Sequence, residues 1–453
     1  MTENATERLP RRTKLMYGVG DTGFSITSTL ISVYYLLFLT DVVGLRPALA
    51  GLAMMIVKQW DWINDPIVGY LSDRTRTRWG RRRPFLLFGF IPFALAFLFM
   101  WWQPPITEQT GLLIYYILVY VLYDTAATFV YMPYFALTPE LTLDYDERTS
   151  LTGYRMAFSI LGSLIAFIVP GILVGTFRPE NSRRILLNAG IFAALTALTL
   201  FLTFLGTRER PEFKATARPG LRASLHAALR NRPFLFGIGL FLLTWLAVDV
   251  IQAVLLYFLR YYLHMESYSS IIFGVIFVTA LLVLPLWDWA SRHTNKRTAY
   301  ILGIAFWAAV QITLVMLGPT TPLPVILALC ALAGIGVGAA HILPWAMIPD
   351  TVEWDEMQTG QRHEGMFYSL VMLIQKAAVG LALFLVGLAL EWSRYVPNAE
   401  IQPDSALLAI RAFAGPVPAL LLAGGILFAL FFPIGRESHR TIREELSRRR
   451  QRV

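Results

Sequence analysis

The sequence predicts an all-α membrane protein that crosses the bilayer many times. Hydrophobic residues make up 56% of the 453 positions and charged residues only 15%, and the mean hydropathy is +0.55. A soluble chain of this size needs more polar surface than that. The apolar residues also form runs of about 20, the length that crosses a hydrocarbon core of ~30 Å. Because backbone groups in lipid must be satisfied within their own segment, we expect these runs to be helices.

The apolar runs predict twelve transmembrane helices. In chain order they cover residues 15–41, 46–72, 84–103, 111–138, 149–175, 184–206, 233–260, 268–290, 298–317, 322–348, 364–391 and 412–434. Of the 39 Lys and Arg residues, 29 fall in the tails and loops on one side of these spans and 7 on the other. Positive residues concentrate on the cytoplasmic side, so we expect both termini in the cytoplasm.

A basic linker at residues 207–232 divides the spans into six plus six. It contains Pro211, Pro219 and Gly220, and its segment ASLHAALRN is typical of a short amphipathic helix at the membrane surface. The sequence therefore predicts an N-terminal six-helix bundle at 1–206, a second at 233–435 and a basic cytoplasmic tail at 436–453. Two such halves are the usual plan of a transporter with a site at mid-membrane. The net charge of +9 follows from the positive loops, and we expect no nucleic-acid partner.

Ionisable residues inside the predicted spans indicate a polar interior. Each such group costs roughly 2.5–3.5 kcal/mol in hydrocarbon on insertion scales, so it usually faces a cavity or a partner. The group consists of Asp21, Lys58, Asp61, Asp65, Asp124, Arg155, Asp249, His341 and Lys376. Most of them lie in the first half of the chain.

The second span carries a candidate cation site. Lys58, Asp61 and Asp65 are spaced by three and four residues and share one helix face, with Asn64 beside them. Carboxylate and amide oxygens are hard ligands that suit Na⁺ or a proton, and they do not choose between the two. Alternatively, the two carboxylates pair permanently with Lys58 and Lys376 and serve only the structure.

The fourth span carries a candidate substrate surface. Asp124, Thr128 and Tyr131 share a face, and Asp124 lies near mid-membrane by the ~1.5 Å rise per residue. Lys376 lies at similar depth in the eleventh span. A carboxylate accepts hydroxyl hydrogen bonds and a phenol ring stacks on a sugar face, so this set suits a polyhydroxylated ligand. A packing role for Tyr131 and Tyr134 is the alternative.

The loop after the second span is a candidate conformational gate. It reads GYLSDRTRTRWGRRRP from Gly69, with Asp73 and Arg74 at the helix end and Gly80 and Arg81 further along. A carboxylate at a helix end can bind the basic residues across a tight loop and lock one conformation. The simpler interpretation is a positive anchor on the cytoplasmic side, and the two roles are compatible.

At these residues the sequence resembles the major facilitator superfamily, and within it the glycoside–pentoside–hexuronide:cation symporters, the melibiose permease family. Four stretches carry the resemblance: KLMYGVGD, WDWINDPIVGYLSDRTRTRWGRRRP, MPYFALTPELTLDYDERTSLTGYRM and PDTVEWDEMQTGQRHEGMFYSLVMLIQKA. They are spread over nearly the whole chain. The resemblance implies a twelve-helix major facilitator fold and transport by alternating access.

The resemblance also assigns roles to residues. Asp61, Asn64, Asp65 and Thr128 match the family's cation ligands. Three further matches are basic residues inside the spans, Lys58, Arg155 and Lys376.

The chain departs from the melibiose permeases at the sugar site. Ser25 and Tyr131 stand where those proteins have sugar-binding acids, while Asp21 and Asp124 are nearby but not equivalent. Galactoside specificity therefore does not carry over. The eukaryotic lysolipid symporters are similar in the same pattern and likewise lack the sugar acids.

We predict a symporter that couples inward Na⁺ or H⁺ movement to uptake of a sugar or glycoside. The first alternative keeps the fold and makes the cargo a lysolipid-like amphiphile. An intramembrane enzyme is the second alternative, and it is disfavoured because Cys330 and His341 are isolated and form no catalytic set. We expect a monomer in the cell membrane, in contact with lipid, with no cofactor and with Na⁺ or H⁺ as the coupling ion. If the ion is a metal ion, Na⁺ would occupy the cation site.

Overall fold

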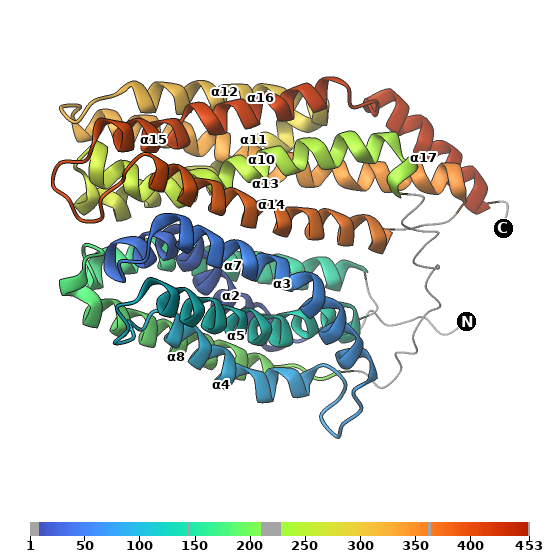
Figure 1. Ribbon diagram of the computed structural model, residues 1–453. Coiled ribbons are helices and arrows are strands. Elements are labelled where there is room, and N and C mark those ends of the chain that lie inside the picture. The colour runs from blue at the N-terminus through green and yellow to red at the C-terminus, as the bar shows by residue number, and fades with distance from the viewer. Residues whose placement is uncertain (1–8, 143–144, 210–227, 361–363, 452–453) are drawn as a thin grey trace. The chain divides into compact units, whose positions relative to one another are not determined.

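The computed structural model describes residues 9–142, 145–209, 228–360 and 364–451, and these residues form helices joined by loops (Figure 1). The chain divides into two compact units. The first comprises Met1–Ala215 with Pro397–Ala399, and the second comprises Thr216–Val396 with Glu400–Val453. The linker segment 210–227, including most of the predicted amphipathic helix, lies outside the described residues.

The first unit follows the order of the predicted spans. Its helices are α1 (Arg11–Gly18), α2 (Gly20–Leu30), the π-helical turns η1 (Ile31–Tyr35) and η2 (Phe38–Val42), α3 (Pro47–Arg74), α4 (Arg83–Met100), α5 (Gln109–Ala136), α6 (Thr138–Leu141), α7 (Tyr145–Leu173), the 3₁₀ turn η3 (Pro179–Asn181) and α8 (Ser182–Gly206). Buried tyrosines, among them Tyr34, Tyr35 and Tyr116, fill much of its interior.

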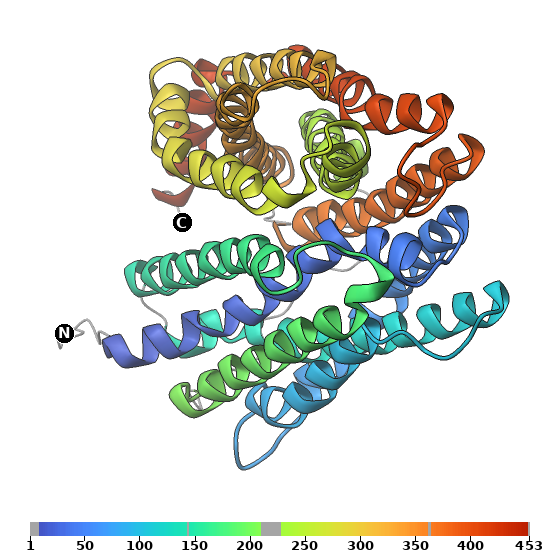
Figure 2. The same cartoon turned by 90° about the vertical axis from the view of Figure 1, so that its left-hand side faces the viewer.

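The second unit is a bundle that Figure 2 views nearly end on. Its helices are α10 (Arg232–Tyr257), the π-helical turn η4 (Phe258–Tyr262), the 3₁₀ turn η5 (Glu266–Tyr268), α11 (Ser269–His293), α12 (Lys296–Met316), α13 (Leu323–Thr359), α14 (Glu364–Trp392), α15 (Asp404–Ala414), α16 (Pro416–Leu430) and α17 (Arg436–Gln451).

Ten helical segments of the described residues are long and apolar enough to cross a membrane. The prediction of an all-helical, multi-span membrane protein is confirmed. The two remaining predicted spans are helical as well. Span 15–41 is divided among α1, α2, η1 and η2, and span 46–72 is α3, whose polar residues around Lys58 and Asp61 lower its hydropathy. Twelve spanning segments therefore agree with the structure.

Three boundaries differ from the sequence prediction. Helix α13 continues to Thr359 instead of ending near residue 348, because the polar stretch after Pro349 remains helical until Gly360 ends it with φ of +70°. The last span starts at Asp404, with a break at Gly415 just before Pro416. Residues 436–451 of the tail form α17, which buries Ile442 and Leu446.

Close packing of α2 on α7 positions polar groups in the first unit. A Cβ atom at Gly162 would lie 2.7 Å from the carbonyl oxygen of Thr22, so only glycine permits this approach. Small residues bring membrane helices together in this way. The contact lies beside Asp21 and one helical turn from Ser25.

One buried residue fixes the start of the second unit. Asn231 accepts a hydrogen bond from the backbone N–H of Phe234 at 2.9 Å, and its amide nitrogen donates to the Thr351 carbonyl at 3.0 Å. The same side chain therefore caps α10 and joins it to α13.

Replacing Asn231 by Ala should lower stability by about 1–2 kcal/mol, because a helix cap is lost and a buried carbonyl loses its donor. Thermal unfolding in detergent, followed by intrinsic fluorescence, measures the change. Asn295→Ala is the matched control, because Asn295 caps α12 through Thr298 and Asn295 is only partly buried. An unfolding midpoint that drops no further for Asn231→Ala than for the control would contradict the bridging role.

Candidate functional site

Helices α3 and α5 bring two buried carboxylates to one lysine. The Lys58 ammonium lies 3.9 Å from an Asp61 carboxylate oxygen and 3.6 Å from an Asp124 carboxylate oxygen. Asp61 is 1% exposed and Asp124 is 6% exposed. Lys58 therefore connects α3 to α5 electrostatically. Its partner on α5, Asp124, is a residue that sequence analysis assigned to the substrate surface.

A second set of contacts joins the same two helices one turn further along. The Thr128 hydroxyl donates to an Asp65 carboxylate oxygen at 3.3 Å. The Asn64 amide nitrogen lies 3.5 Å from the Asp124 backbone carbonyl, which leaves its amide oxygen as a ligand. The predicted cation ligands Asp65 and Thr128 therefore meet directly, and Asn64 faces the same turn of α5.

Pro66 removes a helical hydrogen bond in this region and so leaves a backbone carbonyl oxygen available, a feature that sequence analysis overlooked. It lies inside α3 directly after Asp65. Because proline has no backbone N–H, it cannot donate to the carbonyl of Trp62 one turn earlier. The sequence signal is the dipeptide Asp65-Pro66 within a polar helix face.

The donor chemistry suits a monovalent cation. No group of three or more His, Cys, Asp or Glu that could hold a metal ion occurs in the described part of the chain. A carboxylate, a hydroxyl and an amide are instead combined here, and these hard oxygen ligands fit Na⁺. Trp60 supports the arrangement, because its indole N–H donates to Thr125 on α5 at 2.9 Å.

Helices α2 and α7 carry a second polar group. The Arg155 guanidinium Nε lies 3.4 Å from Asp21 Oδ2, and Asp21 is buried. The hydroxyls of Ser25 and Ser159 are 2.6 Å apart. Asp21, Ser25 and Arg155 therefore form one polar layer between these helices, with the guanidinium 4.9 Å from the ring centre of Phe135.

Tyr131 lies in an aromatic cluster. Its ring centre is 4.6 Å from that of Phe24 and 5.4 Å from that of Phe93, and the residue is 3% exposed. Its buried hydroxyl has no hydrogen-bond partner among the described residues. This environment favours the packing role over a sugar-stacking role. Lys376, the remaining predicted substrate residue, is partly buried on α14 of the second unit.

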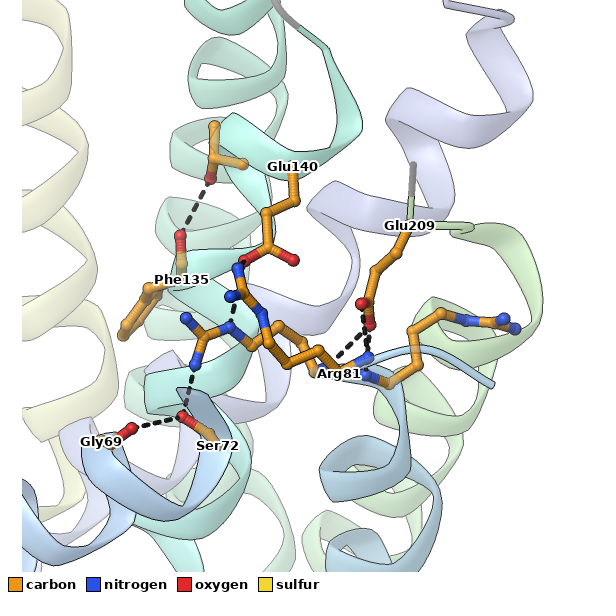
Figure 3. A network of polar contacts seen from close by, with 9 residues as sticks. Gly69, Ser72, Arg81, Phe135, Glu140 and Glu209 are labelled. Carbon is orange, nitrogen blue, oxygen red and sulfur yellow. Dashed lines mark hydrogen bonds and ion pairs between the residues drawn. The ribbon is translucent and has the colours of Figure 1, made fainter. Parts of the chain in front are cut away.

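Carboxylates that sequence analysis did not single out bind the arginines of the loop between α3 and α4. The Arg81 guanidinium lies 2.5 Å from a Glu140 carboxylate oxygen, and Arg82 lies 3.2 Å from the same atom (Figure 3). Arg82 also donates to the Ser72 hydroxyl at the end of α3. The Asp73 side chain lies outside the described residues, and the guanidinium of Arg74 is over the ring of Tyr70.

Three consecutive backbone N–H groups of this loop bind one carboxylate. The amides of Arg81, Arg82 and Arg83 lie 2.5, 2.7 and 2.8 Å from the carboxylate oxygens of Glu209 (Figure 3). Gly80 has a φ of +107°, which aims these groups at one point. We call this arrangement the Glu209 nest. It attaches the start of α4 to the segment that follows α8.

The two acids differ in how visible they are in the sequence. Glu140 stands within the motif MPYFALTPEL that carries the family resemblance. Glu209 stands between two arginines in the segment RERPEF, and an acid in such surroundings gives no distinctive signal. Only the fold brings both to the loop.

Comparison with known proteins places this architecture. Residues 16–436 match the family described as MFS/sugar transport protein. An uncharacterized symporter of Synechocystis is 37% identical over 99% of this chain and 98% of its own length. The sodium-dependent lysophosphatidylcholine symporter 1-A of Danio rerio is 30% identical over 94% of this chain and 86% of its length. A mouse sphingosine-1-phosphate transporter is 29% identical over 98% and 93%.

Solved structures share the fold at low identity. A D-xylose–proton symporter matches with a TM-score of 0.66 and 16% identity, covering 93% of this chain and 97% of its own. A bacterial homologue of the lysosomal transporter Spinster matches with a TM-score of 0.64 and 14% identity, covering 96% and 98%. Both are transporters of the same helical architecture.

Gly80→Ala should break the Glu209 nest. The new Cβ would lie 2.6 Å from the Glu209 carboxylate, and a non-glycine residue at this φ is strained by about 1–3 kcal/mol. We expect a lower midpoint of thermal unfolding in detergent. Gly153→Ala is the control, because its Cβ would meet nothing within 4 Å on α7. A midpoint for Gly80→Ala equal to that of the parent would argue against the nest.

Proposed function

The chain belongs to the MFS/sugar transport protein family of the major facilitator superfamily, and we propose that it is a Na⁺-coupled symporter. The cargo that we propose is a single-chain, phosphate-bearing amphiphile resembling a lysolipid. It is a multi-pass membrane transporter rather than an enzyme, and its relatives support cation-coupled symport. The cargo class, the ion and the residue roles below are the parts we propose.

The observation that carries the proposal is the chemistry at the two positions of the sugar acids. Ser25 is hydrogen-bonded to Ser159, and Tyr131 is enclosed by aromatic rings. Neither side chain offers the paired acceptor oxygens with which a carboxylate binds sugar hydroxyls. A cargo recognised mainly by apolar contact and by one charged head fits these residues better.

The charges of the first unit suit a phosphate head. Arg155 contacts Asp21 on one side and the ring of Phe135 on the other. A guanidinium binds phosphate oxygens in a bidentate manner, so Arg155 is the residue that we propose for the cargo phosphate. The relatives named for lysophosphatidylcholine and sphingosine-1-phosphate support this, since both compounds combine one alkyl chain with a phosphate-bearing head.

We assign the coupling ion to α3 and α5. Na⁺ would be held by Asp61, Asn64, Asp65 and Thr128. Because Lys58 lies between Asp61 and Asp124, a cation that takes over Asp61 would leave the lysine to Asp124. Ion binding then changes how α3 meets α5, and such a differential contact is what coupling needs.

Alternating access requires a lock that opens and closes. We propose that the bundles at 1–206 and 233–435 move against each other to open the site to one side of the membrane at a time. The linker 207–232 and both termini would lie in the cytoplasm. The loop with Asp73, Arg74, Gly80 and Arg81 would be the cytoplasmic gate. Its support is the pair of carboxylates, Glu140 and Glu209, that hold the loop in the present conformation.

A sugar or glycoside is the second candidate cargo. The family description favours it, and Asp21 and Asp124 are buried acids that accept hydrogen bonds from hydroxyls. In that case the ion pairs of Asp124 with Lys58 and of Asp21 with Arg155 would have to break before the two acids could bind sugar hydroxyls.

Asp65→Asn and Asp61→Asn should each abolish Na⁺-driven accumulation of cargo in proteoliposomes. The physical reason is loss of the carboxylate that distinguishes the ion-bound state, which removes a coupling of about 1–3 kcal/mol, or roughly 5- to 150-fold in cargo affinity. Gradient-free exchange should persist in both variants. Asp404→Asn, at an exposed helix start, is the control. Accumulation at the parental level in both site variants would reject the ion assignment.

A lysophosphatidylcholine below its micelle concentration should raise the apparent unfolding temperature of the purified protein in Na⁺, and less so in choline chloride. Binding to the native state at 100 times Kd adds about 2.7 kcal/mol of stability. Melibiose and xylose should give no shift. The reverse result, with a Na⁺-dependent shift from a sugar alone, would select the second candidate. Arg155→Gln should weaken the lysolipid effect while leaving any effect of Na⁺ by itself.

A further inference from the structure

The first unit has an apolar groove on its outer surface between α4 and α5. Its volume is about 470 Å³, and it runs from the loop after α3 along both helices. Phe85, Phe88 and Pro92 of α4 form one wall, and Leu122 and Phe129 of α5 form the other. Phe88 and Leu122 are 64% and 55% exposed, and both belong to helices long and apolar enough to cross a membrane.

Small residues make the groove deep. Gly89 and Ala126 lie on its floor, and a Cβ at Gly89 would already lie 2.5 Å from Val130. The floor also includes Thr125, whose hydroxyl accepts the Trp60 indole N–H. The groove therefore lies against the turn of α5 that carries Asp124 and Thr128.

The end of the groove is positively charged. Thr75 and Thr77 line it there, and the exposed Arg76 and Arg78 alternate with them in the chain. Among the described residues, neither arginine has an ion-pair partner, whereas Arg81 and Arg82 share Glu140. The Arg78 guanidinium is 4.2 Å from the Trp79 ring centre, and that ring packs edge-on against Phe88.

Charge and shape together identify the occupant. The hydroxyls of Thr75 and Thr77 already donate to the carbonyls of Leu71 and Gly80. The exposed side chains of Arg76 and Arg78 offer charged donors to an anionic group at this end. Arginines beside the membrane attract anionic headgroups, and an apolar groove of this kind takes an alkyl chain.

We propose that this groove is a binding site for an anionic phospholipid of the cytoplasmic leaflet. One acyl chain lies between α4 and α5, and the phosphate is bound by Arg76 and Arg78. The site lies on the outer face of the first unit and is separate from the residues assigned to ion and cargo. The lipid's acyl chain packs against Thr125, which binds Trp60 of α3. The bound lipid therefore stabilises the contact of α3 with α5.

The test compares phosphatidylglycerol with phosphatidylcholine. Delipidated protein in detergent is titrated with each lipid, and bound lipid is counted by native mass spectrometry while thermal unfolding is followed in parallel. We expect preferential binding of phosphatidylglycerol with a rise in the unfolding midpoint. Arg76→Gln with Arg78→Gln should weaken phosphatidylglycerol binding about 25-fold, at roughly fivefold for each juxtamembrane arginine, and should weaken phosphatidylcholine binding less, because choline already offsets the charge of its phosphate.

The control changes two exposed arginines at the far end of the same unit. Arg183 and Arg184 begin α8, whose other end reaches Arg83 through Phe204, so about 30 Å separates them from the groove mouth. Arg183→Gln with Arg184→Gln should bind phosphatidylglycerol as the parent does. Equal binding by both double variants, or equal losses in both, would overturn the site.

Two further variants test the groove itself. Ala126→Phe fills the floor and should reduce binding of both lipids, whereas glycerophosphoglycerol without acyl chains should not compete. Phe88→Ala removes an exposed wall and serves if Ala126→Phe does not fold. Unchanged lipid binding in the folded groove variant would refute the acyl-chain position, whatever the cargo proves to be.

Discussion

The cost of placing charge inside a membrane governs the first unit. Lys58 lies within 4 Å of carboxylate oxygens on both Asp61 and Asp124, so one ammonium neutralises groups on two helices. Such groups are costly in hydrocarbon unless they are paired. The same requirement makes α3 and α5 dependent on one another, because neither helix can move alone without separating opposite charges. A transporter can use that dependence, since an incoming cation is an alternative partner for the acids.

At the α3–α4 loop the concentrated charges are positive, and carboxylates neutralise them. Arginines are concentrated in this loop, and Glu140 and Glu209 hold them from α6 and from the segment after α8. Glu209 binds backbone amides rather than guanidinium groups, so the contact depends on loop conformation and on Gly80. A conformational change that reshapes the loop must release this carboxylate. The first unit therefore has an electrostatic connection between α3 and α5 and another at the α3–α4 loop.

The identity of the cargo depends on what the buried acids are doing. Asp21 and Asp124 each have a basic neighbour. The resemblance to the melibiose permeases implies that Ser25 and Tyr131 stand where those proteins have sugar-binding acids. The family description alone would favour a sugar, whereas the relative named as a sodium-dependent lysophosphatidylcholine symporter is 30% identical over 94% of this chain. An amphiphile leaves both ion pairs available to its charged head, whereas a polyol would have to displace them.

The sequence by itself determined the helical class, the succession of spans and the spacing that puts Asp61 and Asp65 on one helix face. These features depend on hydropathy and on the 3.6-residue period, which are local properties. It misplaced the ends of α13 and of the last span, where helix continues through polar or proline-containing residues. Only the tertiary structure decided that Lys58 meets Asp124, that Tyr131 is enclosed by aromatic rings and that Glu209 reaches the loop. These contacts join residues between 66 and 128 positions apart or enclose a ring from three helices, and no local pattern encodes such distances.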